Sequence, residues 1–201
     1  MSITIKNKSI NCGQGVIEMR EPYERDIKKE ILEKCFDYLV RKGLAEASIK
    51  NLCEETGISS GSIYYWFNNK DEVILDTTEY GLTVVTNKLF DYAFGHIADI
   101  REVIQTFPDE LMKYKNELRF IYQVTTSSQY GYAMRKMVDK LDITYDAYAK
   151  KLSSYMEYNY ETLRPFVYLF ISAAFDYIVW EDEKKIAMEL NTIYKAITAL
   201  Y

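Results

Sequence analysis

The chain has 201 residues, a net charge of −5 and a composition that is 48% hydrophobic. These values are typical of a globular chain with an ample core, and they argue against intrinsic disorder. The three cysteines are scattered, and the chain has one histidine, His96. This pattern argues against a disulfide framework and against a structural zinc site, so we expect no metal and no cofactor.

Neither a leader nor a membrane span is evident in the sequence. Residues 1–15 lack the continuous apolar core of a signal peptide. The longest apolar run, residues 165–180, is interrupted by Asp176 and is shorter than the roughly 20 residues that span a bilayer. The sequence therefore predicts a cytoplasmic protein with no membrane partner.

Helix is the expected structure nearly everywhere, because the chain has three prolines and eight glycines and no segment alternates with period two. Residues 1–22 are expected to form a flexible arm that ends at Pro22. A first helix follows, with apolar residues at helical spacing from Ile27 to Leu39. Gly43 supplies its left-handed C-cap.

Two short helices come next. Ser48 is the expected N-cap of the first, and Gly57 ends it. Ser59 or Ser60 caps the second, and Lys70 opens a long helix beyond it. Two short helices joined by a tight glycine turn make a helix-turn-helix.

The second short helix carries an aromatic run, IYYWF, at residues 63–67. A step of 100° per residue turns Ile63 and Phe67 toward the core, with Trp66 at the boundary. The outward face then consists of glycine, serine and tyrosine, namely Gly61, Ser62, Tyr64 and Tyr65. Because it has hydroxyl donors, flat rings and no carboxylate, this face suits a DNA major groove and its phosphates.

The order of these features over residues 27–75 closely resembles the DNA-binding domain of the TetR family of transcriptional repressors. The resemblance rests on ILEKCFDYLVRKG (31–43), SIKNLCEETGISSGSIYYWF (48–67) and NNKDEVI (68–74). It implies that Ser48, Tyr64 and Lys70 contact phosphates and that Gly61 lets the backbone approach DNA closely. The other DNA-binding residues that it implies are the base readers Ser60, Ser62 and Tyr65, and Trp66, which stands where His or Tyr is commoner.

The charge of this segment departs from the family pattern. Residues 20–72 contain nine basic and eleven acidic side chains, so we expect DNA binding that is weak or strongly salt-sensitive. The same balance supports an alternative, a helical interaction protein that retains a DNA-binding-like module without operator binding.

Beyond residue 75 the resemblance is architectural, and it implies that residues 76–201 form a helical domain that binds a ligand and dimerises. Residues 1–22 are then the arm, and residues 23–75 are the DNA-binding domain. Periodicity predicts helices that end near 94, begin near 98 with an interruption at Pro108, and cover 116–127 and 130–158. Thr162 is the expected cap of the next helix, with Pro165 in its first turn.

Two segments near the C-terminus predict a homodimer. The run at 165–180 is apolar nearly all round, which favours core on one side and a partner subunit on another. The last helix has apolar residues at alternating spacings of four and three, as in a helical bundle. Packing of this helix on its own domain is the alternative. The predicted interface residues are Phe166, Phe170, Ile186, Leu190, Ile193 and Ile197.

The helices of the C-terminal domain are rich in tyrosine, phenylalanine and methionine. The simple interpretation is core, and the functional one is a cavity lined by rings and adaptable thioethers. Such a cavity favours an aromatic or cationic small-molecule effector. The predicted ligand-binding residues are Met112, Phe120, Tyr122, Met134, Met137, Tyr148, Phe170 and Phe175.

The sequence contains no phosphate-binding glycine loop, no metal-binding pair and no histidine-based catalytic constellation, so we expect no enzyme and no catalytic residue. The predicted fold is all-α, with an N-terminal helix-turn-helix domain and a C-terminal helical domain. The predicted function is a ligand-responsive transcriptional regulator, a repressor, that binds a near-palindromic operator as a homodimer and is released by a small molecule.

Overall fold

The computed structural model describes residues 14–96, 99–156 and 158–199, and it describes their side chains except at 14–25, 137–141 and 156. Within these ranges the chain is helical and contains no β-strand, so the predicted all-α fold is confirmed. Residues 1–13 of the predicted arm lie outside the described residues.

The first helix, α1 (Gln14–Lys42), begins earlier than predicted and runs through Pro22. The expected helix start after Pro22 is therefore wrong. A proline inside a helix removes one hydrogen bond and costs about 3 kcal/mol. The segment around Pro22 is rich in glutamate, arginine, lysine and methionine, and the high helix propensity of these residues offsets part of this cost.

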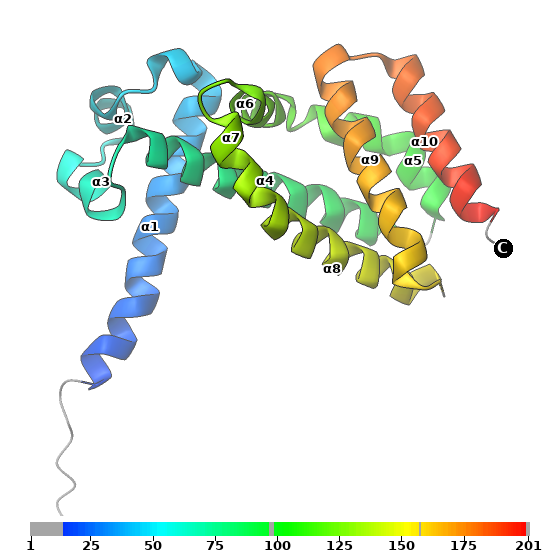
Figure 1. Cartoon of the computed structure of the whole chain (residues 1–201), viewed down its shortest axis with the longest axis horizontal. Coiled ribbons are helices and arrows are strands. Elements are labelled where there is room, and N and C mark those ends of the chain that lie inside the picture. The colour runs from blue at the N-terminus through cyan, green and yellow to red at the C-terminus, as the bar shows by residue number, and fades with distance from the viewer. Residues whose placement is uncertain (1–13, 97–98, 157, 200–201) are drawn as a thin grey trace, which may run out of the picture.

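The predicted helix-turn-helix is present. Gly43 follows α1 with a positive φ of 80° and an extended ψ of 172°, so it is not the left-handed helical cap that was predicted, and a short 3-10 turn η1 (Leu44–Glu46) comes next. Figure 1 shows α2 and α3 beside α1, while α4 leads away from them into the second half of the molecule. The bounds are α2 (Ile49–Thr56), α3 (Ser60–Trp66) and α4 (Lys70–Gly95).

The second half of the chain consists of six further α-helices and one 3-10 turn among the described residues. In Figure 1, α9 and α10 lie at the end of the molecule opposite α2 and α3. The elements are α5 (Ile100–Met112), α6 (Lys115–Thr126), α7 (Gly131–Met134), η3 (Arg135–Met137), α8 (Val138–Met156), α9 (Tyr160–Trp180) and α10 (Glu183–Thr198).

Four predicted details of these helices are wrong. Pro165, expected in the first turn of α9, lies further inside that helix, which begins at Tyr160. Pro108 lies inside α5 without interrupting it, because Phe107 and Leu111 are buried and hold both sides of the proline against the core. The single helix predicted over 130–158 is divided into α7, η3 and α8. The N-cap of α9 is Asn159 and not the predicted Thr162. The Asn159 side chain accepts a hydrogen bond from the backbone N–H of Glu161.

A single hydrophobic cluster joins the two predicted domains. Phe36 of α1 packs edge-on against Phe120 of α6, with ring centroids 6.0 Å apart. Gly81 of α4 lies directly under Phe36, and a Cβ at this glycine would be 2.0 Å from the Phe36 ring. The cluster also holds Ile63 of α3 and Ile121 of α6, so the core continues across the predicted boundary between residues 75 and 76.

A second cluster buries the apolar face of α10 within the chain. This face packs against α9 and α5 of the same chain. The dimer interface predicted on this face of α10 is therefore wrong, and the alternative, packing of the helix on its own domain, holds. Spacing identifies an apolar face but not the helix that covers it. The buried α10 residues are Ile186, Leu190, Ile193 and Ile197, and the half-buried Phe166 and Phe170 of α9 pack against the same cluster.

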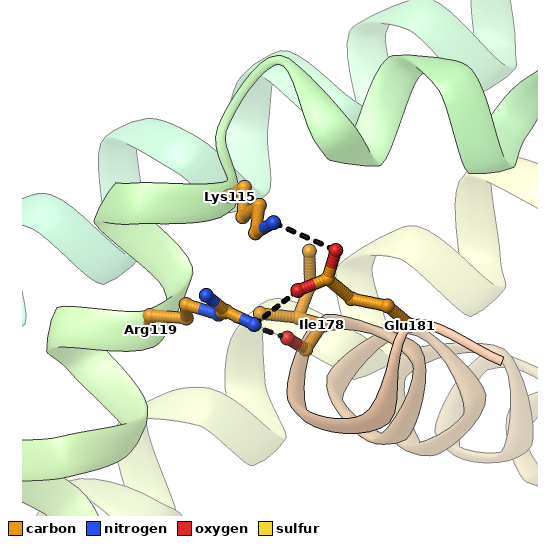
Figure 2. Close-up of polar contacts among 4 residues, drawn as sticks. All are labelled: Lys115, Arg119, Ile178 and Glu181. Atoms are coloured by element: carbon orange, nitrogen blue, oxygen red, sulfur yellow. Dashed lines mark hydrogen bonds and ion pairs between the residues drawn. The ribbon is translucent and has the colours of Figure 1, made fainter.

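The turn between α9 and α10 is anchored to α6 by charged groups (Figure 2). Glu181 adopts a left-handed conformation, with φ of 53°, and its carboxylate pairs with Lys115 Nζ at 2.7 Å and with the Arg119 guanidinium. Arg119 Nε also donates to the Ile178 carbonyl oxygen at 3.2 Å. These cations lower the pKa of the Glu181 carboxyl, with the Lys115 hydrogen bond as the largest cause.

Among the described residues, α9 is long and apolar enough to cross a membrane by length and composition alone. The core helix of a soluble protein meets the same criterion. In this structure α9 packs against α5, α6, α8 and α10.

The contact between Phe36 and Gly81 gives a stability prediction. Gly81→Ala would force a methyl group into the buried Phe36 ring, so we expect a loss of about 1–3 kcal/mol in the free energy of unfolding. Gly95→Ala is the matched control on the same helix, because nothing lies within 4 Å of a Cβ there. Urea denaturation followed by circular dichroism measures both, and equal midpoints for the two variants would refute the close contact.

Candidate nucleic-acid interface

Serine and glycine residues cap the ends of α2 and α3. Ser48 caps α2, as predicted, with its Oγ accepting a hydrogen bond from the Asn51 backbone N–H at 3.1 Å. Gly57 ends α2 with φ of 71°, a left-handed conformation that favours glycine. Ser59, one of the two predicted candidates, caps α3 through a 3.0 Å bond from the Ser62 N–H. Each turn residue thus satisfies a free backbone group at a helix end.

The inward and outward faces of α3 lie as the sequence predicted. Ile63 and Phe67 are buried, with 0% and 1% of their surfaces exposed. Tyr64 and Tyr65 are 57% and 68% exposed, which is unusual for large aromatic side chains. Trp66 is half-buried and packs edge-on against Tyr65 at 4.9 Å. The result is a rigid helix that presents two phenol rings to solvent.

The N-terminal end of α3 is exposed and carries small polar residues. Ser60 and Gly61 are exposed, and Ser62 is half-buried with its Oγ 2.8 Å from Ser59 Oγ. A Cβ at Gly61 would meet only Ser59 Oγ, at 3.8 Å. Packing inside the molecule therefore does not require glycine at this position.

The start of α4 contains a cap that the sequence analysis missed. Asn69 is the N-cap, since its Oδ1 accepts a 2.9 Å bond from the Glu72 backbone N–H. Glu72 Oε2 in turn accepts two 2.7 Å bonds, from the backbone N–H and the side-chain Nδ2 of Asn68. The Asn-x-x-Glu spacing is the signal of a capping box, although here the Glu72 carboxylate bonds Asn68, the residue before the N-cap, and not Asn69 itself. The cap holds the exposed Lys70 at the first position of α4, next to α3.

Charge is distributed unevenly around this surface. Residues 57–70 contain no acidic side chain, so the outward face of α3 carries no carboxylate of its own. Glu54 and Glu55 on α2 are exposed, and Glu54 faces Lys50 at 3.9 Å. Over residues 57–70 the surface is therefore nearly neutral, and its charged side chain is that of Lys70, at its edge.

A small apolar cavity lies in the second half of the molecule. Its volume is about 80 Å³. Two of the predicted ligand-binding residues, Tyr148 and Phe170, line it, together with Phe90 and Phe94 of α4. Phe175 instead lines a neighbouring cavity of about 30 Å³, to which Phe170 also contributes.

The other predicted ligand-binding residues do not line these cavities. Phe120 and Met134 are buried in the cluster shared with the helix-turn-helix. Phe120 also lines a more open pocket of about 300 Å³ next to Leu39 and Arg119, away from these two cavities. Met112 packs against the second cluster, and Tyr122 is 39% exposed. The Met137 side chain lies outside the described residues. Among the described residues, no group of three or more His, Cys, Asp or Glu side chains is placed to hold a metal ion.

The cap at the start of α4 gives a pH prediction. The two hydrogen bonds from Asn68 lower the pKa of the Glu72 carboxyl below its ordinary value of 4.5, the backbone N–H being the larger cause. The stabilisation is therefore present above pH 4.5 and is lost as the pH falls through the lowered pKa. A carboxyl-carbon NMR titration measures it, and we expect Asn68→Ala to return the pKa only part of the way. A wild-type pKa at or above 4.5 would refute the cap.

Comparison with known proteins concerns mainly this N-terminal surface. The family described as "Bacterial regulatory proteins, tetR family" matches residues 31–77. Over 78 residues, 39% of this chain and 38% of the relative, the chain is 26% identical to the HTH-type transcriptional regulator PksA of Bacillus subtilis. Over 68 residues, 34% of this chain and 33% of the relative, it is 31% identical to the uncharacterised HTH-type transcriptional regulator YdeS of the same organism.

The fold of most of the chain is also similar to that of a solved structure. It is similar to a transcriptional regulator, described as of the TerR/AcrR family, from Aquifex aeolicus, with a TM-score of 0.52 and 14% identity. The similarity covers 87% of this chain and 99% of that one. The matches to PksA and YdeS span less than two fifths of those proteins and of this chain. The capped helices, the outward face of α3 and the family match together show that residues 31–77 form a helix-turn-helix similar to that of the TetR family of bacterial regulatory proteins.

Proposed function

We propose that this chain is a ligand-responsive transcriptional repressor in the cytoplasm that binds a near-palindromic operator as a homodimer. The observation that carries the proposal is the outward face of α3. It exposes two tyrosine rings and a glycine, and it has no carboxylate. Exposed aromatic side chains on a short, well-capped helix fit a partner that supplies both stacking surface and hydrogen-bond acceptors, as DNA does.

Each residue of this surface has a specific role in this proposal. Gly61, which internal packing does not require, lets the backbone of α3 approach the duplex closely. Tyr65, with Ser60 and Ser62, reads base edges. Tyr64 and Lys70 contact phosphates on either side of the groove. Ser48 uses its oxygen as the cap of α2, and its hydroxyl hydrogen is the group that donates to a phosphate.

The decisive experiment is a gel shift with the DNA that flanks the gene of this protein, at two salt concentrations. With few cations on the surface, we expect binding at low salt that weakens as salt rises. No binding at low salt would favour the alternative, a helical interaction protein that retains a DNA-binding-like module.

A second copy of the chain is the partner that we propose for α9 and α10. Although α9 is apolar, only 28% of its most apolar window is buried within the chain. Leu169 of α9 and Met188 of α10 are 54% and 63% exposed. An isologous contact buries such residues twice and brings two α3 helices to the roughly 34–36 Å spacing of successive major grooves.

Ligand control follows from the length of α4. This helix begins at Lys70, beside the DNA-binding face, and contributes Phe90 and Phe94 to the cavity wall. A ligand that changes the packing of Phe90 therefore changes the position of the reading helices. The coupling between ligand and DNA is reciprocal. If the bound ligand lowers the affinity of the protein for DNA tenfold, bound DNA lowers the affinity of the protein for the ligand tenfold, which is a coupling free energy of about 1.4 kcal/mol.

Gly61 provides the test of the docking surface. Gly61→Glu places bulk and negative charge where the backbone approaches DNA, so we expect operator binding to be lost. The fold should be unaffected, because a side chain at this exposed position enters open space. Gly61→Ala is the matched control and should retain most of the affinity. Fluorescence anisotropy with a labelled operator measures both, and wild-type affinity in Gly61→Glu would exclude this docking mode.

Leu169 provides the test of the dimer. We expect Leu169→Glu to shift the protein from dimer to monomer in sedimentation velocity at micromolar concentration, and to lower operator affinity in parallel. Ile143→Glu on α8 is the control, because Ile143 is 72% exposed and lies outside the proposed interface. A folded Leu169→Glu monomer that binds the operator as tightly as wild type would refute the dimer model.

A further inference from the structure

The two apolar cavities of the C-terminal half are neighbours separated by side chains. Phe90 of α4 and Phe170 of α9 line both the 80 Å³ cavity and the 30 Å³ cavity. Their ring centroids are 6.5 Å apart, and Phe170 also contacts Phe107 at 4.2 Å. These two rings therefore form a partition between the cavities, held by ring contacts and not by backbone.

The walls of both cavities are free of charge among the described residues. Thr86 and Tyr148 are the only described lining residues with polar side-chain atoms. The Tyr148 hydroxyl donates to Asn87 Oδ1 at 2.5 Å, so its hydrogen already has a partner. Burial is the main cause that raises the pKa of Tyr148 to about 12, so this phenol stays neutral at physiological pH. A ligand inside would meet carbon atoms almost exclusively.

The aromatic rings are also poorly placed to hold a cation. A cation needs an open ring face, and Tyr148 is stacked on Phe90 at 3.6 Å. Lys151 Nζ lies 4.2 Å from the centre of the Phe94 ring, so a face of that ring already has a cation. The attraction of the remaining faces is smaller than the cost of taking an unpaired ion out of water.

The volumes indicate how a ligand fits. Ligand sites usually measure about 300–1,000 Å³, so neither cavity alone holds more than a small ring. Opening the partition is the direct way to enlarge the space, because each of its rings already borders an empty volume on both sides.

We propose that the effector is an uncharged, elongated apolar compound that occupies both cavities, with Phe90 and Phe170 turned aside. This inference rests on the proposed function, and it narrows the aromatic or cationic effector class expected from the sequence. Because Phe90 belongs to α4, opening the partition also displaces the helix that leads to the DNA-binding surface.

Matched pairs of compounds test the charge of the ligand. n-Butylbenzene is the uncharged probe, and 4-phenylbutylamine and 4-phenylbutyrate carry the same ring and chain with one charge. In thermal-shift titrations of the wild-type protein without DNA, we expect n-butylbenzene to bind at least roughly tenfold more tightly than either ion. Equal affinity for 4-phenylbutylamine, or no binding of n-butylbenzene, would overturn the proposal.

Two substitutions test the use of both cavities. Ala93→Leu fills the larger cavity and should weaken both toluene and n-butylbenzene. Ala174→Leu fills the smaller one and should weaken n-butylbenzene while leaving toluene unchanged. Ala187→Leu, on the exposed side of α10, is the control. If Ala174→Leu folds and binds n-butylbenzene like wild type, the ligand does not span both cavities.

The outcomes also separate this inference from the proposed function. Ligand binding is measured without DNA, and operator binding is measured without ligand. A protein that binds its operator but not n-butylbenzene overturns the ligand class alone. A protein that binds n-butylbenzene but no DNA overturns the regulator function and retains the site. If the variants fail to fold, the wild-type comparison of charged and uncharged probes still decides the question of charge.

Discussion

The close approach of α1 and α4 at Gly81 is the constraint on which the rest of the structure depends. A side chain of any size at residue 81 would occupy the space of the Phe36 ring. Because the glycine leaves this space open, Phe36 reaches across α4 and packs against Phe120 of α6. One hydrophobic cluster thus includes α3, whose outward face is the proposed DNA-binding surface, and α6 of the C-terminal half. The two predicted domains share a core, so neither moves without repacking the other.

Helix α6 continues this connection to the far end of the molecule. One of its faces buries Phe120 and Ile121 in the shared cluster. Lys115 and Arg119 hold the Glu181 carboxylate at the turn between α9 and α10 (Figure 2). The first contact is apolar and buried, and the second is ionic and partly exposed, so salt screens only the second. The helices proposed to form the dimer are therefore tied to the core that positions α3.

The sequence predicted the two short helices and the two faces of α3 because the signals for them are local. Ser48, Gly57 and Ser59 act on backbone groups within three or four residues of themselves, and the two faces of α3 follow from helical geometry alone. Signals of this kind do not depend on the rest of the fold. The missed cap at Asn69 and Glu72 has the same local character, and its spacing was present in the sequence.

The C-terminal half was predicted less well because its errors concern distant partners. The apolar face of α10 was recognised, but the sequence did not show that α9 and α5 of the same chain cover it. Likewise, the density of aromatic residues predicted a cavity but only some of the rings that border it, namely Tyr148, Phe170 and Phe175. Phe120 fills the shared core, whereas Phe90, which was not predicted, lines the empty space.

Helix α4 links all of these features through its length. With a rise of about 1.5 Å per residue, Lys70 and Phe90 are roughly 30 Å apart along the helix axis. Gly81, the point where α1 presses on α4, lies near the middle of this distance. If α4 moves as a rigid rod about that point, a shift at Phe90 gives a shift of similar size and opposite direction at Lys70. The same close contact that joins the two halves thus makes the position of the proposed phosphate-binding lysine depend on the packing of the cavity wall.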